Sequence, residues 1–394
     1  FYALPQSPQL FKQLLMVSGM ERYFQIARCF RDEDLRANRQ PEFTQIDMEM
    51  SFVRRSDIME IVEGLIKEIF SLIDVKTDSF PVMSYNEAMD RFGSDKPDLR
   101  FGMELKNISD IVANSEFNIF RSVVEDGGEV KGIKVSGGAE LSRSQIDRYT
   151  DYVKIFGASG LAWIALRPDG IKSPIARFLN EEEIEGIKEK FSAEVGDLLL
   201  MVADRRRVVA DALGNLRLKV AEDKNMIPAE DYKFTWIVDF PLLEYSEEEK
   251  RYVAMHHPFT SPIEKDIELL DSEPEGVRAN AYDLVLNGEE LAGGSIRIHD
   301  LELQQKVFSI LDFTEEEVED KFGFLLEAFR YGAPPHGGIA FGMDRLIMIL
   351  SGADSIRDVI AFPKTQKAIS PLTQAPSTVS RKQLKELHIK IDGE

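Results

Sequence analysis

The sequence predicts an α+β protein, in which an antiparallel sheet flanked by helices is interrupted by an α+β insertion. Three observations favour this class. Several short segments alternate apolar and polar residues, other segments repeat apolar residues every three or four positions, and the strand pattern returns after a middle block. The 394 residues include 48 Lys and Arg against 69 Asp and Glu, and 43% are apolar. This composition is typical of globular proteins and excludes disordered or fibrous chains.

The first expected elements follow one another closely. Residues 9–16, QLFKQLLM, have a helical pattern. Residues 22–31 and 42–52 alternate as strands, joined by the charged loop RDEDLRANRQP. Residues 56–73 have the spacing of an amphipathic helix. Around residues 92–106 the chain becomes polar and rich in Gly, Asp and Pro, which predicts a domain boundary.

The middle block has short elements of its own. GLAWIAL at 160–166 is typical of a strand, and residues 194–218 are expected to form a helix. Its apolar stripe would consist of Leu198, Val202, Ala203 and Val209. From residue 234 onward the strand pattern returns. One interrupted domain explains this order, with its parts at residues 1–99 and 231–394 and the insertion at residues 100–230.

Several classes of protein are disfavoured by composition. The single cysteine, Cys29, excludes an intrachain disulfide and a Cys-rich zinc site, and it favours a reducing, cytoplasmic location. The longest apolar runs, such as residues 346–350, are far shorter than the ~20 residues that span a bilayer, and no signal peptide is expected. The acidic excess disfavours broad, non-specific binding of nucleic acid. The chain opens FYALPQSPQLFKQ without Met, so we expect further chain upstream.

Residues 42–52 carry the first candidate site. Strict alternation places Phe43, Gln45, Asp47 and Glu49 on one strand face. Such residues make a poor core, so this face is either solvated or part of a site. The preceding strand and the loop add Gln25, Arg31, Glu33, Arg36 and Arg39. Guanidinium groups suit phosphate and an aromatic ring suits a base, which favours the site.

A second candidate is a hairpin. Asn287-Gly288 between alternating strands predicts a type I′ turn, which would place Val285 opposite Glu290. Asp283 would then be the diagonal neighbour of Glu290, ~7–8 Å away at the backbone. Two carboxylates at this spacing can share a hard cation that also binds phosphate. The alternative is a solvated acidic edge.

The segment GGIAFGMDRLIMIL is the third candidate. A strand is expected to end at Gly342, and Arg345 would lie in the first turn of a helix, where the helix dipole disfavours a cation. Arg345 is therefore either functional or an ordinary surface residue. His256-His257 fits zinc poorly, because neighbours on a strand point to opposite faces and no matching ligands follow. GxGxxG, GxxxxGK[ST] and GxSxG are absent, so arginines on a sheet would bind phosphate.

These motifs resemble a known family. CFRDEDLRANRQPEFTQID resembles motif 2 of class II aminoacyl-tRNA synthetases, and GIAFGMDRL resembles their motif 3. FYALPQSPQLFKQ, MHHPFT and GGSIRIH resemble the bacterial aspartyl-tRNA synthetases, so the likeness covers essentially the whole chain. Lysyl relatives lack QSPQ, and the long insertion resembles the GAD domain of the bacterial aspartyl type. On this resemblance, the N-terminal anticodon-binding domain and motif 1 are missing from the sequence.

The resemblance implies a class II synthetase fold with a GAD-type insertion and the activity of an aspartate–tRNA ligase. Such an enzyme joins L-aspartate to ATP, forming aspartyl-adenylate and pyrophosphate, and requires Mg²⁺. It then transfers aspartate to the 3′ end of tRNA(Asp), and whether tRNA(Asn) is also charged stays open. A homodimer of the full-length protein and no membrane association are also implied.

The resemblance also implies roles for individual residues. Arg31 would hold the α-phosphate, Phe43 and Arg345 would clamp adenine, and Arg31, Glu290 and Arg345 would be catalytic. The implied ATP-binding residues are Arg31, Asp32, Glu33, Gln40, Phe43, Glu290, Gly342, Met343, Asp344 and Arg345. The implied aspartate-binding residues are Gln9, Lys12, Arg31, Asp47, His256, His257 and Arg297, with Lys12 and Arg297 facing the side-chain carboxylate. Asp283 and Glu290 would bind Mg²⁺.

Two alternatives remain. One is an asparaginyl-tRNA synthetase-like enzyme, which exchange of pyrophosphate with aspartate or asparagine would distinguish. The other is a non-catalytic synthetase paralogue, which the presence of Arg31, Glu290 and Arg345 disfavours.

Overall fold

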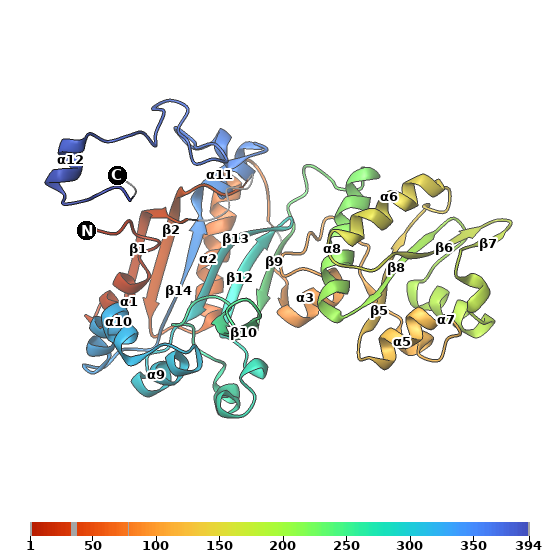
Figure 1. Ribbon diagram of the computed structural model, residues 1–394, viewed down its shortest axis with the longest axis horizontal. Coiled ribbons are helices and arrows are strands. Elements are labelled where there is room, and N and C mark those ends of the chain that lie inside the picture. The colour runs from red at the N-terminus through yellow and green to blue at the C-terminus, as the bar shows by residue number, and fades with distance from the viewer. Residues whose placement is uncertain (1, 33–37, 78, 393–394) are drawn as a thin grey trace. The chain divides into compact units, whose positions relative to one another are not determined.

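The computed structural model describes residues 2–32, 38–77 and 79–392 (Figure 1). Two of the charged loop residues named above, Glu33 and Arg36, lie outside the described residues. The chain divides into two compact units. Unit 1 comprises Phe1–Lys76 and Leu291–Glu394, and unit 2 comprises Thr77–Glu290. Helices accompany mostly antiparallel strands in both units, which confirms the predicted α+β class.

Unit 1 is built on antiparallel strands. β1 (Arg22–Phe30) pairs with β2 (Glu42–Ser51), β2 pairs with β14 (His336–Gly342), and β14 pairs with β13 (Glu289–Ile296). Helix α1 packs against β2, and α2 packs against β14 (Figure 1). The helices of this unit are α1 (Gln9–Val17), α2 (Arg55–Ser71), α9 (Leu301–Ile310), α10 (Glu315–Phe329), α11 (Met343–Ser351) and α12 (Arg381–Glu386).

In unit 2, β12 (Ala281–Leu286) pairs antiparallel with β9 (Phe234–Val238), and β9 pairs in parallel with β3 (Val82–Ser84). A small hairpin joins β10 (Leu243–Ser246) to β11 (Arg251–Ala254). A separate five-stranded sheet has the order β4 (Lys106–Asn107), β5 (Glu129–Val135), β8 (Leu198–Asp204), β6 (Ala162–Arg167) and β7 (Gly170–Lys172).

Helices cover both faces of the five-stranded sheet (Figure 1). One apolar core lies between the sheet and α6 and α8, and the other lies between the sheet and α4, α5 and α7. The helices of unit 2 are α3 (Tyr85–Phe92), α4 (Ser109–Val112), α5 (Asn118–Glu125), α6 (Arg143–Lys154), α7 (Glu181–Phe191) and α8 (Arg206–Asp223). The predicted bounds of the insertion, residues 100–230, remain a prediction.

One predicted element is wrong. Residues 194–218 do not form one helix, because Leu198–Asp204 is strand β8 and the helix α8 begins at Arg206. The run LLLMV in β8 is buried at every position, since the sheet is covered on both faces. A strand buried on both faces has no polar alternation, so its apolar run matches a helical stripe equally well.

In the part of the chain that the structure describes, none of the helices combines the length and apolar composition that a bilayer crossing requires.

Candidate active site

Four charged side chains form a buried cluster in unit 1. Lys12 Nζ of α1 lies 2.6 Å from Asp47 Oδ1 and 3.0 Å from Glu49 Oε2 of β2. Arg297, which follows β13, donates from Nε to Glu49 Oε1 at 2.9 Å and from Nη2 to Glu49 Oε2 at 3.1 Å. None of the four residues is more than 2% exposed. Two cations and two carboxylates are thus held together away from water.

Strand alternation brings the carboxylates of this cluster inward. The solvated-face alternative for β2 is wrong, because Asp47 and Glu49 are buried while Ile46 and Met48 on the other face are half-exposed. Gly338 of β14 lies directly opposite Glu49. A Cβ at Gly338 would collide with the Glu49 carboxylate, so this glycine of the GGIAFG segment makes room for the charge.

The two carboxylates of the cluster differ in electrostatic environment. Burial by itself would raise the pKa of Glu49, but Arg297 and Lys12 together lower it to about 2. Burial raises the pKa of Asp47 above its usual value, and Lys12 offsets this effect only in part. Glu49 therefore stays ionised, and Asp47 is the member that takes up a proton more easily.

A shell of polar groups surrounds the cluster. Arg297 Nη1 donates to Ser295 Oγ at 2.6 Å, and Gln9 Nε2 donates to Gln13 Oε1 at 3.0 Å. Gln13 Nε2 lies 3.3 Å from Nε2 of the buried His336, whose pKa is lowered by burial. Sequence reasoning placed Glu49 on the candidate face of β2 but gave it no role of its own, and it gave no role to Gln13 or His336.

Lys12 and Arg297, predicted to face a substrate carboxylate, are thus already paired with carboxylates of the chain. Their charge is balanced within the cluster in this structure. Their role toward a substrate stays a prediction.

The predicted nucleotide residues lie around β2 and the start of α11. The Arg31 guanidinium carbon lies 5.0 Å from the centre of the Phe43 ring. β14 ends at Gly342, and Arg345 lies half-buried in the first turn of α11 beside Met343, as predicted. Helix α11 contacts β2, so the arginine-bearing turn and the aromatic strand belong to one region of unit 1.

Three further predicted nucleotide residues have other surroundings. Asp344 Oδ2 accepts a hydrogen bond from the Thr44 backbone N–H at 2.7 Å. Gln40 is buried, and its amide exchanges hydrogen bonds with the Lys364 backbone at 2.7 and 3.1 Å. Asp32 is exposed. Asp344 and Gln40 thus hold the local backbone in place.

Unit 2 contains the predicted hairpin. Asn287 and Gly288 have φ values of +54° and +88°, as a type I′ turn requires. Asp283 on β12 is buried, and Lys96 Nζ lies 2.9 Å from Glu290 Oε2. Burial, partly opposed by His256 and reinforced by Glu290, raises the pKa of Asp283 to about 6. The positive charge near Asp283 therefore lowers its pKa by less than burial raises it.

The chemistry of this acidic pair fits a magnesium ion. Asp283 Oδ1 has no hydrogen-bond partner in the described chain, since His256 Nε2 is 3.5 Å away, too far for a strong bond. Mg²⁺ is commonly held by one or two carboxylates together with phosphate oxygens and water. Among the described residues no group of three or more His, Cys, Asp or Glu is arranged to hold a metal, so an all-protein cage is excluded there.

The histidine pair lies in a bend after β11 and not on a strand, contrary to expectation. The His256 ring packs edge-on against Phe240 at 4.7 Å. His257 Nδ1 accepts a hydrogen bond from the Phe259 N–H at 3.2 Å. The two side chains therefore have separate surroundings.

Comparison with known proteins identifies the family. The model of the tRNA synthetases class II (D, K and N) matches residues 1–366. The chain belongs to this family. Class II synthetases use ATP as a substrate, which agrees with the motif 2 and motif 3 resemblances.

Relatives support the aspartyl branch of the class II synthetases. An aspartate–tRNA(Asp/Asn) ligase of Halothermothrix orenii is 70% identical over 100% of this chain and 67% of its own length. The corresponding ligase of Caldanaerobacter subterraneus subsp. tengcongensis is 61% identical with the same coverage. An aspartate–tRNA ligase of Clostridium botulinum is 58% identical over 99% of the chain and 66% of its own length. The predicted resemblance to bacterial aspartyl-tRNA synthetases is confirmed.

A similar solved structure is an aspartyl tRNA synthetase from Entamoeba histolytica, which is 18% identical and has a TM-score of 0.47 over 93% of this chain and 52% of the other.

Proposed function

We propose that this chain is the amino-acid-activating part of an aspartate–tRNA ligase. It joins L-aspartate to ATP to form aspartyl-adenylate and pyrophosphate, and it then transfers the aspartyl group to the 3′ end of tRNA and releases AMP. The observation that carries the proposal is the buried cluster of Lys12, Asp47, Glu49 and Arg297 beside the motif 2 strand. The names of relatives 58–70% identical to this chain support the same amino acid.

Adenylate formation suits these residues. The attacking carboxylate is ionised at neutral pH, so no general base is required, and alignment of the reactants alone supplies ~7–11 kcal/mol. Arg31 and Arg345 are the arginines that stabilise charge on the phosphoryl oxygens. Phe43 offers its ring to the adenine base.

Selection of aspartate over asparagine follows from charge. The two amino acids have almost the same shape, so a site that distinguishes them must respond to the negative charge. The side-chain carboxylate of a bound aspartate can form ion pairs with Lys12 and Arg297. Asp47 then takes up the compensating proton, because its pKa is the raised one in the cluster. Asparagine carries no side-chain charge, so it would form no such ion pairs.

We also propose that Asp283 and Glu290 hold Mg²⁺. When bound, the ion supplies positive charge to phosphate oxygens. The chain contributes two carboxylates on one hairpin, and Lys96 pairs with Glu290 in competition with the ion. The RNA substrate is tRNA(Asp), with tRNA(Asn) as the open alternative. A homodimer of the full-length protein and a cytoplasmic location belong to the same proposal.

The test is ATP–pyrophosphate exchange with L-aspartate, L-asparagine or L-lysine as the only amino acid. Exchange with aspartate alone is expected, and Arg345→Ala should abolish it. Arg177→Ala, an arginine of unit 2 that contacts Phe178, is the matched control and should keep full activity. Exchange with asparagine alone would favour the asparaginyl alternative. Binding of an aspartyl-adenylate analogue without any exchange would favour a non-catalytic paralogue.

A further inference from the structure

The C-terminal end of the chain differs in charge from the rest. Residues 359–394 carry six Lys and Arg against three Asp and Glu, whereas the preceding 358 residues carry 42 against 66. A segment of net positive charge in a strongly acidic protein often binds a polyanion. None of the residues assigned above to adenylate formation lies beyond Arg345.

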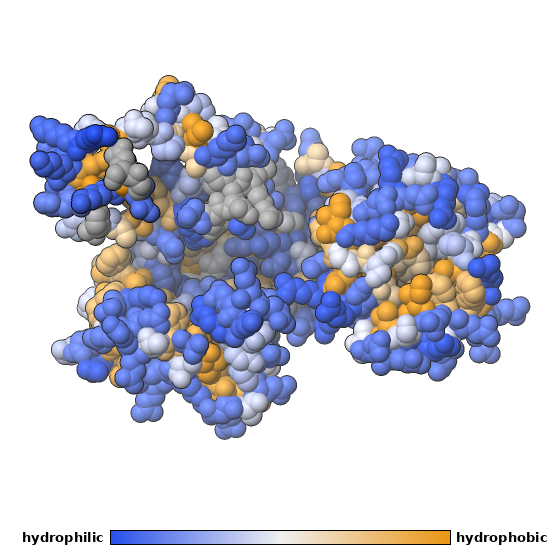
Figure 2. Space-filling model, viewed as in Figure 1, coloured by the Kyte–Doolittle hydropathy of each residue, from blue (hydrophilic) through white to orange (hydrophobic). Residues whose placement is uncertain are grey.

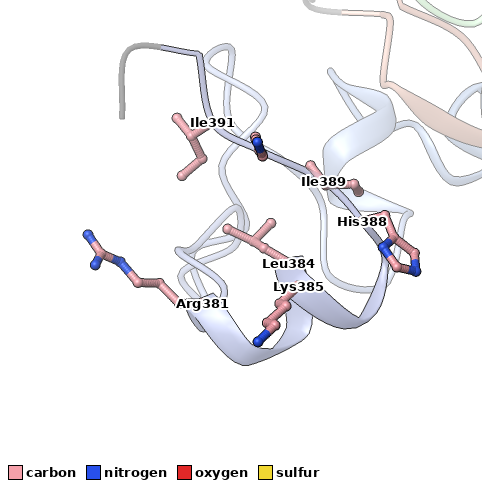
Figure 3. A pocket seen from close by; sticks show the side chains of 7 residues that line it. Arg381, Leu384, Lys385, His388, Ile389 and Ile391 are labelled. Atoms are coloured by element: carbon pink, nitrogen blue, oxygen red, sulfur yellow. The ribbon is translucent and has the colours of Figure 1, made fainter.

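The end of this segment folds around a cavity. Helix α12 and the tail that follows it line an open hollow of about 620 Å³. In Figure 3 the tail returns past the helix, so that Ile391 lies across from Leu384, while Arg381 extends away. None of the described lining residues is acidic. The walls combine the apolar side chains of Leu384, Ile389 and Ile391 with the cations Arg381, Lys385 and Lys390.

The side chains of this segment are available to a partner. Helix α12 buries none of its residues, and Leu387 and Ile391 are 61% and 52% exposed. Figure 2 shows hydrophobic residues bordered by hydrophilic ones on this part of the surface, at the upper left. Lys385 and Lys390 have no ion-pair partner within the described ranges. A six-residue helix that buries none of its residues has little stability of its own, so binding would order it further.

We propose that residues 381–391 form an RNA-binding surface, in which the cations contact phosphates and the apolar walls receive one nucleotide. A cavity of this volume falls within the usual range of ligand sites, roughly 300–1,000 Å³. Phosphate contacts by Lys and Arg supply most of the sequence-independent affinity for nucleic acid. A membrane surface is less suitable, because a single helix of six residues buries far less apolar area than interfacial helices do.

The identity of the RNA rests on the proposed function, which makes tRNA the natural partner. The surface would hold the sugar–phosphate backbone without reading its bases, since phosphate contacts position a nucleic acid but carry no sequence information. Binding should therefore depend on salt and hardly on sequence.

The probe is a labelled RNA hairpin that reproduces a tRNA acceptor arm with its single-stranded 3′ end. Its affinity for the chain is measured between 0.05 and 0.2 M salt. In Lys385→Ala/Lys390→Ala, the slope of log affinity against log salt should become shallower by about 1.4 to 1.8, because each of the two lost phosphate contacts contributes about 0.7–0.9. Affinity at the lowest salt concentration should weaken about tenfold.

Two matched variants control for general loss of charge. Lys172→Ala/Lys190→Ala removes two exposed lysines of unit 2 and should leave the slope unchanged. Lys385→Arg/Lys390→Arg keeps both charges and should retain the slope. Circular dichroism of each variant establishes that the fold is intact.

Pyrophosphate exchange separates this proposal from the proposed function. If the wild-type chain exchanges with aspartate but the alanine pair leaves the salt slope unchanged, the RNA surface is overturned and the activity stands. If exchange is absent but the slope falls as expected, the RNA surface stands and the activity is overturned. Binding to vesicles of phosphatidylglycerol is measured last. If the alanine pair bound vesicles more weakly than the wild type but bound RNA equally well, the segment would be a membrane-binding surface and the proposal would be overturned.

Discussion

The charged cluster of unit 1 and the acidic pair of unit 2 both bury ionisable groups, but they handle charge in opposite ways. In the cluster, Lys12 and Arg297 meet two carboxylates at 2.6–3.1 Å. In the pair, Asp283 has a histidine 3.5 Å away and Glu290 meets a partly exposed lysine. The buried carboxylates of the cluster therefore have close cations, whereas the buried carboxylate of the pair does not.

The pKa values record the consequence. Despite complete burial, the pKa of Glu49 is lowered to about 2 by its cations, whereas burial and Glu290 raise the pKa of Asp283 to about 6. A balanced cluster holds its own geometry, as a selective pocket requires. An unbalanced pair is less stable by itself and gains from a cation. Similar buried carboxylates can thus either hold the geometry of a pocket or bind a cation, depending on the charges beside them.

The largest effect is expected for Glu49→Gln. It leaves Arg297 without its carboxylate and Lys12 with one, so the free energy of unfolding should fall by ~3–5 kcal/mol. Because the folded pKa of Glu49 is lowered, its contribution is present above about pH 4.5 and is lost as pH falls toward 2. Urea denaturation at pH 7 measures the change.

Glu42→Gln is the matched control for this variant. Glu42 lies on the same strand, is about a quarter exposed, and pairs with Lys364 and Arg28. Its loss should cost less than about 1 kcal/mol. Equal losses in the two variants would contradict the view that the buried cluster is the stronger network.

Asp283→Asn should raise the free energy of unfolding, whereas Glu49→Gln lowers it. The folded pKa of Asp283 is raised above the unfolded value, so the wild-type protein loses stability as pH rises from about 4 to about 6. Without metal, Asp283→Asn should therefore be more stable than wild type by about 2–3 kcal/mol at pH 7.5 and nearly equal at pH 4. Urea denaturation in chelator across this pH range measures it.

Asp266 provides the contrast for Asp283. It is also buried, but Arg278 lowers its pKa. Asp266→Asn should consequently destabilise the protein at pH 7.5. Added Mg²⁺ should stabilise the wild type and Asp266→Asn, but not Asp283→Asn. If all three responded equally to Mg²⁺, the ion would bind elsewhere.

Phe43→Ala tests the substrate-facing side of β2, next to the buried cluster. Loss of the ring should remove roughly 1–3 kcal/mol of adenine binding and raise the ATP requirement about ten- to hundredfold. The aspartate requirement should hardly change, because the cluster is intact. Steady-state exchange with each substrate varied in turn gives the ATP and aspartate requirements. An unchanged ATP requirement would show that Phe43 does not bind adenine.

The smallest effect is expected for Lys96→Gln. Lys96 and Glu290 are both about one-third exposed, so the change in stability should be below about 1 kcal/mol. The variant removes the cation that competes for Glu290, so half-saturation by Mg²⁺ should need a concentration several-fold lower. A higher requirement would show instead that Lys96 supports the metal site.

Much of the local structure could be predicted from residue patterns. The helix at Gln9, the two strands around the charged loop, the Asn287-Gly288 turn and the strand–helix junction at Gly342 were all expected. Periodicity and turn chemistry act over a few residues, so they can be read directly. The same rules failed at β8. This strand is covered on both faces, so its residues do not alternate between polar and apolar, and that alternation is the pattern by which a strand is recognised.

The candidate site was predictable as a set of residues but not as a network. Alternation along β2 is enough to put Asp47 and Glu49 on one face. It cannot reveal that Glu49 pairs with Arg297, 248 positions away, since the register of β2 with β14 and of β14 with β13 decides this contact. Gly338 likewise is one glycine among several in the sequence, and only its position opposite Glu49 shows which group needs the space.

The sequence alone determined which side chains share a strand face, where the chain turns, and which family the motifs resemble. Those properties depend on short-range geometry and on residue identity. Tertiary structure decided which buried charges are balanced, and therefore which pKa values rise and which fall. Charge balance is set within a few ångströms by side chains from distant segments, because Coulomb interactions and desolvation depend on position in space and not on position along the chain.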